Sequence, residues 1–393
     1  MKDAEIRVEH LTIGDTMNQH SFAFDHWSLL QHPIMMKCSR SRRDDILQSS
    51  GSWAVNTSVL ISPFSCRLIM ELFEGVLHLV IVYLQLAVSY PQEDSAIRFI
   101  AFGDGGGLPG PPYVTVVQKA TADEMGRVAQ NSATDFILNV GDNFYYHGVN
   151  DVNDFRFKET FENVFTAPSL GNIPWYILAG NHDHLGNVSA QIAYSGISER
   201  WNFPSLYYEL SFKIPDTNVS VTILMIDTVV ICGNTYQTNQ PKGPENPQLA
   251  QEQLQWIQQK LAHSRSDYLI VAGHYPVWSI GEHGPTPCLV DQLRPLLKKY
   301  NVTAYISGHD HSLQFIREGE GIAYIISGCG SFVDASTENK RKVPSDWLHF
   351  YNSEMSALGG FILIQITAEQ MFASYRQPHG LVVFRSALPK RKF

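Results

Sequence analysis

Five short motifs in the sequence place potential metal ligands directly after a glycine. They are Gly-Asp at 103–104, Gly-Asp-Asn-Phe-Tyr at 141–145, Gly-Asn-His-Asp at 180–183, Gly-His at 273–274 and Gly-His-Asp-His at 308–311. Carboxylate and phenolate oxygens are hard anionic ligands, and imidazole is a borderline one. Each motif alone is weak evidence, because Gly-Asp is usually a turn and an asparagine often only caps a helix. Together they predict a metal centre.

The donor types predict two neighbouring ions of different character. Two carboxylates, a phenolate and a histidine suit a hard trivalent ion such as Fe(III), whereas two histidines, an amide oxygen and a shared carboxylate suit a divalent ion. Two ions that share a carboxylate would lie about 3.5–4 Å apart, as in hydrolases that clamp a phosphate and generate hydroxide.

Short apolar segments precede these motifs and predict the strands that would position them. The segments are 97–102, 136–140, 175–178, 268–272 and 303–307, and helix-like stretches cover 113–130, 153–165, 247–263 and 288–300. This alternation is typical of an α/β fold with largely parallel strands. Ligands of open α/β sheets bind beyond the carboxyl ends of the strands, so we expect the five motifs to converge. The glycines would allow a sharp turn and a close approach to the ligand.

A second group of apolar segments has fewer helices between its members. These segments are 207–214, 219–226, 322–327, 360–366, 371–375 and 381–385. They suit antiparallel strands in a second sheet or at sheet edges. No strong linker divides residues 96–393, and we therefore expect one large domain, in which 234–248 is the longest loop-like stretch.

The N-terminal quarter contains a segment that resembles a targeting signal. Residues 76–88 are uncharged and mostly apolar, which is short for a spanning helix of about 20 residues but suits a signal-peptide core of roughly 7–15. A small-x-small pattern ends at Ser89, so we expect a signal peptide over 70–89 and a mature domain over 90–393, or alternatively a signal anchor at 70–89. A buried helix or strand is another interpretation of 76–88.

Residues 1–69 show no period, repeat or motif and stay unassigned. They could be an upstream extension that is never translated, a cytosolic tail before a signal anchor, or a mostly disordered pro-segment. The first interpretation is favoured by the position of the signal-like segment, and the second by the basic cluster of Arg40, Arg42 and Arg43.

Composition excludes several classes of protein. The formal net charge is −9 and no long basic block occurs, so we expect no nucleic-acid partner. With 44% apolar and 17% charged residues, the chain is neither a disordered tail nor a coiled coil. Five cysteines are too few for a disulfide scaffold but enough for one bridge.

The order of the five motifs resembles the motif set of the purple acid phosphatases, which is Gly-Asp-x-Gly, Gly-Asp-x-x-Tyr, Gly-Asn-His-Asp, Val-x-Gly-His and Gly-His-x-His. The stretches 178–194, 271–280 and 294–297 are especially similar to the small animal type, and the resemblance covers about 97–388. It implies an α/β fold of the metallophosphoesterase type, a four-layer αββα sandwich with two mixed sheets and the metal site at the C-terminal ends of the strands. It also implies an acid phosphatase that hydrolyses phosphate monoesters.

The resemblance assigns a ligand set to each of two iron ions. It implies Fe(III) at Asp104, Asp142, Tyr145 and His311. It implies Fe(II) at Asp142, Asn181, His274 and His309, with Asp142 bridging. Hydroxide held by the ions would attack phosphorus.

Two further histidines match positions near the bound phosphate in the family. His182 would balance charge on the phosphate oxygens, and His182 or His283 would protonate the departing alkoxide. Without the resemblance, His283 would be taken for a surface residue.

The resemblance also carries features of a secreted glycoprotein. Cys232 and Cys288 match the family's disulfide, and the sequons at Asn187 and Asn218 match its glycan sites, whereas glycosylation is less expected at Asn301. It implies lysosomal or secreted residence, phosphate monoester substrates that are small molecules or phosphoproteins, no stable membrane insertion after signal cleavage, and a monomer.

Two departures from the family pattern have expected consequences. Gly105 stands where the family usually has Trp, which predicts a more open site mouth. The loop 234–248 carries Thr-Tyr-Gln at 235–237 where acidic residues would be expected, which predicts that the intact chain is active without proteolysis.

Two other functions compete with an iron phosphatase. One is a related phosphoesterase that uses Mn or Zn on diesters or nucleotides, and the other is a binding protein that kept the fold but lost catalysis. Tyr145 favours Fe(III) over the first, because a phenolate is a hard ligand, and the complete ligand set argues against the second.

Overall fold

The computed structural model describes residues 4–5, 39–40, 76, 95–235 and 240–392. The chain divides into two units, residues 1–92 and 93–393. In the first, β1 (Ala4–Glu5) and β2 (Ser39–Arg40) pair antiparallel. The predicted signal segment 70–89, apart from residue 76, and most of 1–69 lie outside the described residues, so the expectations for them stay predictions. All the motifs lie in the second unit.

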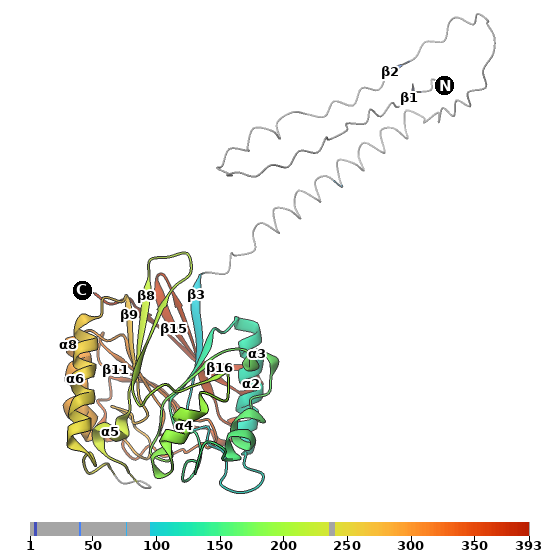
Figure 1. Cartoon of the computed structure of the whole chain (residues 1–393). Coiled ribbons are helices and arrows are strands. Elements are labelled where there is room, and N and C mark those ends of the chain that lie inside the picture. Colours follow the sequence, from blue (N-terminus) through green and yellow to red (C-terminus); the bar gives the residue numbers. More distant parts are fainter. Residues whose placement is uncertain (1–3, 6–38, 41–75, 77–94, 236–239, 393) are drawn as a thin grey trace, which may run out of the picture. The chain divides into compact units, whose positions relative to one another are not determined.

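The second unit is built on two seven-stranded sheets with helices outside them (Figure 1). One sheet has the order β16-β15-β14-β3-β4-β5-β6, and the other β13-β11-β12-β10-β9-β8-β7. The first contains β3 (Ala96–Phe102), β4 (Phe136–Asn139), β5 (Trp175–Ile177), β6 (Trp201–Asn202), β14 (Phe361–Thr367), β15 (Gln370–Gln377) and β16 (Leu381–Pro389). The second contains β7 (Tyr208–Lys213), β8 (Ser220–Met225), β9 (Tyr268–Ala272), β10 (Ala304–Ser307), β11 (Leu313–Arg317), β12 (Ala323–Ser327) and β13 (Leu348–Asn352).

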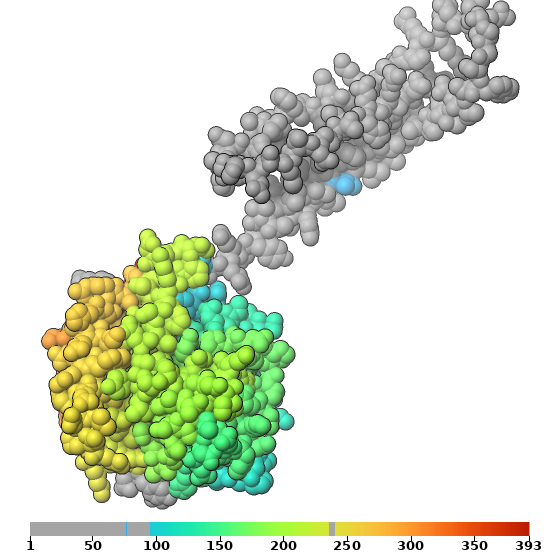
Figure 2. Space-filling view, in the orientation of Figure 1, coloured from blue at the N-terminus to red at the C-terminus, as the bar shows by residue number. Residues whose placement is uncertain are grey.

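Helices cover the outer face of each sheet, which confirms the four-layer αββα sandwich (Figure 1). The α-helices are α2 (Val116–Ser132), α3 (Pro168–Gly171), α4 (Val188–Tyr194), α5 (Thr228–Cys232), α6 (Pro247–His263), α7 (Pro287–Gln292) and α8 (Arg294–Lys299). A π-helix, η1 (Phe157–Glu162), and the 3₁₀ turns η2 (Asp183–Leu185), η3 (Lys340–Lys342), η4 (Met355–Ala357) and η5 (Pro378–Gly380) complete the set in the described residues. In Figure 2 the yellow and orange surface of α6 and α8 lies opposite the blue-green surface of α2.

The pairing of the strands corrects one sequence-based expectation. The two groups of apolar segments do not correspond to the two sheets: β14 pairs antiparallel with β3, while β8 and β12 pair in parallel with β9 and β10. Strands covered on both faces are apolar throughout, so their sequence carries no sign of their partners or direction. Both sheets are therefore mixed.

The facing surfaces of the sheets form the main core. Phe136 of β4 stacks on Phe99 of β3, with ring centroids 4.8 Å apart, and on Phe212 of β7 in the other sheet at 4.7 Å. At the other edge, Phe350 of β13 and Phe384 of β16 stack at 4.7 Å. These contacts hold the two sheets together near both edges.

The helices agree with the sequence patterns except where proline intervenes. The predicted helix 247–263 is observed as α6, and α2 begins after Thr115, whose hydroxyl accepts a hydrogen bond from the Gln118 amide. The predicted helix 288–300 is divided at Leu293 into α7 and α8, because Pro295 cannot donate a helical hydrogen bond. The segment 153–165 forms only the short η1. No helix in the described part of the chain is long and apolar enough to cross a membrane.

Candidate metal centre

The five motifs lie at the ends of strands from both sheets. Those after β3, β4 and β5 carry carboxylate, phenol and amide groups, and those after β9 and β10 carry imidazoles. The two groups meet directly: the backbone amide of His309 donates to both oxygens of Asp104, at 3.1 and 2.9 Å. The predicted convergence is confirmed, although the strands do not share one sheet.

One half of the centre joins Asp104, Tyr145 and His311. The Tyr145 hydroxyl lies 3.2 Å from Asp104 Oδ1 and 2.8 Å from His311 Nε2, and His311 Nε2 lies 3.6 Å from Asp104 Oδ1. Two atoms bonded to one ion at about 2.0–2.2 Å lie roughly 3 Å apart. The spacing of these three side chains therefore fits ligands of a common ion.

The other half joins Asp142, Asn181, His274 and His309. His274 Nε2 lies 3.0 Å from Asn181 Oδ1 and 3.4 Å from Asp142 Oδ2. Ligand atoms of Asp142, His274 and His309 all lie within 4.8 Å of one another, and all three residues are buried. This arrangement brings together the four residues expected to hold the divalent ion.

The hydrogen bonding of His274 supports a cation between these groups. Its Nδ1 lies 2.8 Å from the carbonyl of Val140, which can only accept, so Nδ1 carries a proton. In the neutral ring Nε2 then presents a lone pair to the oxygens of Asn181 and Asp142. Lone pairs facing one another in a buried site need a positive charge between them, and a carbonyl on the far nitrogen is typical of metal-bound histidine.

The pKa values show how the protein compensates with protons. Burial disfavours the protonated ring of His274, but Asp142 and Asp104 outweigh it and raise its pKa to about 9. Burial would raise the pKa of Asp142, but the imidazoles of His274 and His182 lower it. Burial and nearby imidazoles hold the pKa of His309 well below its usual value, which keeps its nitrogen available as a ligand.

The phenol of Tyr145, in contrast to His309, is kept protonated by its surroundings. Burial, together with the negative charges of Asp104 and Asp142, raises the pKa of the Tyr145 hydroxyl well above its usual value. Phenolate would therefore form here only beside a strongly Lewis-acidic cation. The donor set thus fits the predicted hard ion in this half.

Backbone conformation contributes to the placement of the ligands. Asp104, Asp142 and His309 adopt the left-handed region, with φ of 60°, 53° and 69°. Such backbone is uncommon outside glycine and concentrates at functional sites. A Cβ on Gly308 would lie 2.2 Å from Asp104 Oδ2, and one on Gly180 would lie 2.2 Å from Asp142 Oδ1. Both glycines are therefore required by the close approach of a carboxylate.

His182 and His283 lie beside ligand residues of both halves, and their roles near a bound phosphate stay predictions. Both line a cavity of about 350 Å³ together with ligands from both halves of the centre and Tyr146. His182 Nδ1 lies 2.7 Å from the Tyr146 carbonyl, so its Nδ1 donates and Nε2 is left for the cavity. The ring of His283 stacks on that of His309, with centroids 4.0 Å apart.

Sequence analysis overlooked two buried carboxylates that support these residues. Asp183 accepts hydrogen bonds from the amides of Gly180 and Asn143, at 2.8 and 3.1 Å, and so fixes the loops that carry Asn181 and Asp142. Asp310 accepts from the amide of His283 at 2.8 Å. Both stand inside the motifs, and their position beside ligands was the available signal.

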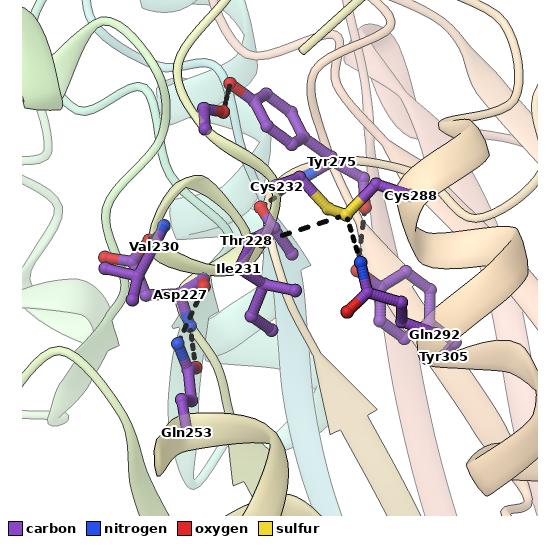
Figure 3. The surroundings of a disulfide bond; sticks show 11 residues. Asp227, Thr228, Val230, Ile231, Cys232, Gln253, Tyr275, Cys288, Gln292 and Tyr305 are labelled. Carbon is purple, nitrogen blue, oxygen red and sulfur yellow. Dashed lines mark hydrogen bonds between the residues drawn. A yellow bond between two sulfur atoms is a disulfide. The ribbon is translucent and has the colours of Figure 1, made fainter. Parts of the chain in front are cut away.

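The expected disulfide is present between Cys232 and Cys288 (Figure 3). It ties the end of α5 to the start of α7, and Asp227 caps α5 by accepting from the Val230 amide at 2.9 Å. The bridge therefore fixes the chain just before the loop 234–248. Residues 236–239 lie outside the described residues, and activity without proteolysis stays a prediction.

The more open site mouth expected from Gly105 stays a prediction. The residue is buried, and a Cβ on it would lie 2.4 Å from Cζ of Phe102, a core ring. The ring of Phe102 therefore fills the space beside this glycine. The expected glycan sites, Asn187 and Asn218, are both exposed.

Comparison with known proteins places this site in a class. Residues 98–313 match the family described as calcineurin-like phosphoesterase, which covers more than half of the chain. The fold resembles the solved structure of GAP50, "the anchor in the inner membrane complex of Plasmodium", with a TM-score of 0.65 and 24% identity over 76% of this chain and 90% of that one. At this identity the likeness concerns the fold alone.

Closer relatives define the family within that class. The chain is 54% identical to tartrate-resistant acid phosphatase type 5 of Homo sapiens over 298 residues, which are 75% of this chain and 92% of that protein. It is 32% identical to purple acid phosphatase 7 of Arabidopsis thaliana over 306 residues, 76% of this chain and 88% of that protein. The chain therefore belongs to the purple acid phosphatases, phosphoric monoester hydrolases with a dinuclear metal centre.

Proposed function

We propose that this phosphatase uses an Fe(III)–Fe(II) pair and acts on phosphate monoesters in acid, whether small molecules or phosphoproteins. The observation that carries the proposal is the asymmetry of the centre. A phenol, the Asp104 carboxylate and one imidazole form one half, and two imidazoles, an amide and the Asp142 carboxylate form the other. Hard anionic donors favour the trivalent ion, and the neutral donors favour the divalent one.

In this proposal Asp104, Tyr145 and His311 hold Fe(III), Asn181, His274 and His309 hold Fe(II), and Asp142 bridges them. When bound, the two ions would supply hydroxide from water as the nucleophile and balance the charge of the phosphate. The contact of His274 Nδ1 with the Val140 carbonyl at 2.8 Å, and the His182 backbone amide that donates to Asp142 Oδ1 at 2.9 Å, orient these donors in advance, so that little rearrangement accompanies binding.

The chain's own residues complete the reaction. His182 is oriented by the Tyr146 carbonyl, which lies 2.7 Å from Nδ1, and in the protonated ring Nε2 can donate to a phosphate oxygen or to the departing alkoxide. His283 is held by the Asp310 carboxylate through its backbone amide and reaches the same cavity. Two imidazoles that line the same cavity can therefore supply the proton that the leaving group needs.

The test combines metal analysis with activity. Purified protein should contain two irons per chain, show a visible phenolate-to-Fe(III) band, and hydrolyse an aryl phosphate with an optimum on the acid side. A colourless enzyme that holds Zn or Mn and works best above about pH 8 would point instead to a divalent-metal phosphoesterase, because its water needs a higher pH to ionise.

We also propose that the chain enters the secretory pathway, with residues 70–89 as the signal peptide, and is secreted or lysosomal as a monomer. The disulfide between Cys232 and Cys288 and the exposed sequons at Asn187 and Asn218 support this location. N-terminal sequencing of secreted protein should begin near Tyr90. Detection of residues before Met70 in that material would contradict the proposal.

A further inference from the structure

Arg156 is a buried arginine whose guanidinium donates hydrogen bonds to three neutral acceptors. Its side chain is 5% exposed, and it precedes η1 in the chain. Nη1 donates to the carbonyl of Tyr145 at 2.7 Å, Nη2 donates to the carbonyl of Gly106 at 2.7 Å, and Nε donates to the hydroxyl of Thr160 at 2.9 Å. Burying a guanidinium is costly, so an arginine used in this way indicates a requirement for its geometry.

The two carbonyls belong to different motifs of the metal centre. Gly106 follows Asp104 by two residues, and Tyr145 is itself the phenol of the Fe(III) half. The carbonyl of Gly106 also accepts the backbone amide of Tyr145 at 3.1 Å. Both peptide groups that flank the Cα of Tyr145 are thus fixed, one directly by Arg156 and the other through the carbonyl that Arg156 holds.

The groups around these hydrogen bonds are closely packed. A Cβ on Gly106 would lie 2.6 Å from the Tyr145 nitrogen and 2.8 Å from the Asp142 carbonyl, so the two loops are in direct contact. Thr160, the third acceptor, also donates to the carbonyl of Tyr113 at 3.1 Å. Gln118 of α2 donates to the carbonyl of Gly105 at a hydrogen-bonding distance and to that of Thr160 at 2.9 Å.

We propose that Arg156 is the positioning residue of the tyrosine ligand: its planar fork clamps the first two motifs together and sets where the Tyr145 oxygen lies relative to Asp104 and His311. A lysine would keep the charge but could not hold both carbonyls and Thr160 in one plane. The residue touches neither substrate nor ligand oxygen, and it acts through the backbone of Tyr145. The proposal rests on the proposed role of Tyr145 as a metal ligand.

The test compares Arg156→Lys and Thr160→Val with the wild type. Thr160→Val removes the Nε acceptor, together with the hydrogen bond from this hydroxyl to the Tyr113 carbonyl, and is the milder change. For Arg156→Lys we expect a displaced and weakened visible band, faster loss of metal to a chelator, and a kcat at least about tenfold lower with little change in KM, because misplaced groups slow catalysis more than they weaken binding. Thr160→Val should move the same quantities in the same direction, by less.

Arg200→Lys is the matched control. Arg200 is also buried, at 8% exposure, but it donates to Glu162 and to the carbonyl of Phe165, away from the motifs. The Arg200→Lys variant should have a lower melting temperature, with the position of the visible band and kcat as in the wild type. The proposal is wrong if Arg156→Lys behaves like Arg200→Lys. It is also wrong if Arg156→Lys does not fold and Thr160→Val folds with the visible band, metal retention and kcat of the wild type.

The outcomes separate this inference from the proposed function. A wild-type protein without iron or colour would contradict the iron assignment. Metal retention, and an effect on kcat without one on KM, would still test the role of Arg156 in that protein, because both can be measured with whatever metal it holds. An effect of Arg156→Lys on these two quantities that Arg200→Lys does not share would support the clamp even then.

Discussion

At the centre of the site, carboxylates, imidazoles and a phenol whose pKa values are shifted in different directions lie close together and buried. The pKa of His274 is raised by facing carboxylates, that of His309 is depressed by burial and facing imidazoles, and that of the Tyr145 phenol is raised by burial and facing carboxylates. Carboxylates, imidazoles and a phenol buried this close together fit a site that binds cations, which compensate the carboxylate charges without protonating the imidazoles.

Tyr145→Phe tests the most specific of these roles. The change removes the phenol oxygen but keeps the ring, which packs edge-on against His182 with centroids 4.8 Å apart. We expect loss of the visible band and a lower kcat, with the fold retained. Tyr268→Phe is the control, because Tyr268 is a fully buried tyrosine of β9 whose hydroxyl is outside the motifs. Survival of the colour in Tyr145→Phe would show that another residue supplies the charge transfer.

Between residues and fold, the strand ends decide where the ligands stand. Gly308→Ala should disturb the centre, because its new Cβ would meet Asp104 Oδ2 at 2.2 Å. We expect at least about a hundredfold loss of activity and weaker metal retention, since an ångström-scale shift of a ligand is enough for such a loss. Gly171→Ala is a matched change, because a Cβ there meets nothing within 4 Å. Equal metal content in both variants would refute the steric argument.

A second element-scale prediction concerns the loop after β5. His184 Nε2 lies 2.7 Å from Asp227 Oδ2, which joins this loop to the cap of α5. Burial lowers the pKa of His184, but Asp227, Asp183 and Glu245 outweigh it, and the net pKa is raised. Because the pKa of His184 is higher in the folded state, its protonated ring contributes to the free energy of unfolding. That contribution is complete below the pKa of the unfolded state, about 6.5, and it is lost as the pH rises through the pKa of the folded state.

Thermal unfolding of His184→Asn should show this sign. Its melting temperature should fall further below that of the wild type at pH 5 than at pH 9. His263→Asn, which changes an exposed histidine at the last residue of α6, is the control for the loss of an imidazole. A deficit that is larger at pH 9 would mean that the charged pair does not stabilise the loop.

The same scale separates what the sequence predicts from what it leaves open. Strands such as β9 and the helix α6 follow from apolar runs and a proline start, and the ligands follow from motifs at strand ends. Sheet membership does not follow, because a fully buried strand such as β12 carries no alternation that would reveal its partners. Arg156 and Asp310 escape sequence reasoning because their roles rest on backbone groups far along the chain.

At the scale of the whole molecule, the centre joins the two sheets. Asp104, Asp142, Tyr145 and Asn181 follow strands of one sheet, while His274, His309 and His311 follow strands of the other. Bound metal would therefore cross-link the halves of the sandwich. Ions that bind the folded chain better than the unfolded one stabilise it by mass action.

Removing the metal should therefore lower the melting temperature of the whole domain, and not only its activity. Ligand at about a hundred times its Kd adds roughly 2.7 kcal/mol, which for a domain of this size corresponds to a shift of several degrees. Differential scanning calorimetry with and without a strong chelator measures it. Asp142→Asn should melt at a temperature that the chelator hardly changes, because the shared carboxylate is gone. If the wild type also melts at one temperature with and without metal, the ions do not join the sheets, and the sandwich is held by contacts such as Phe136 on Phe212 alone.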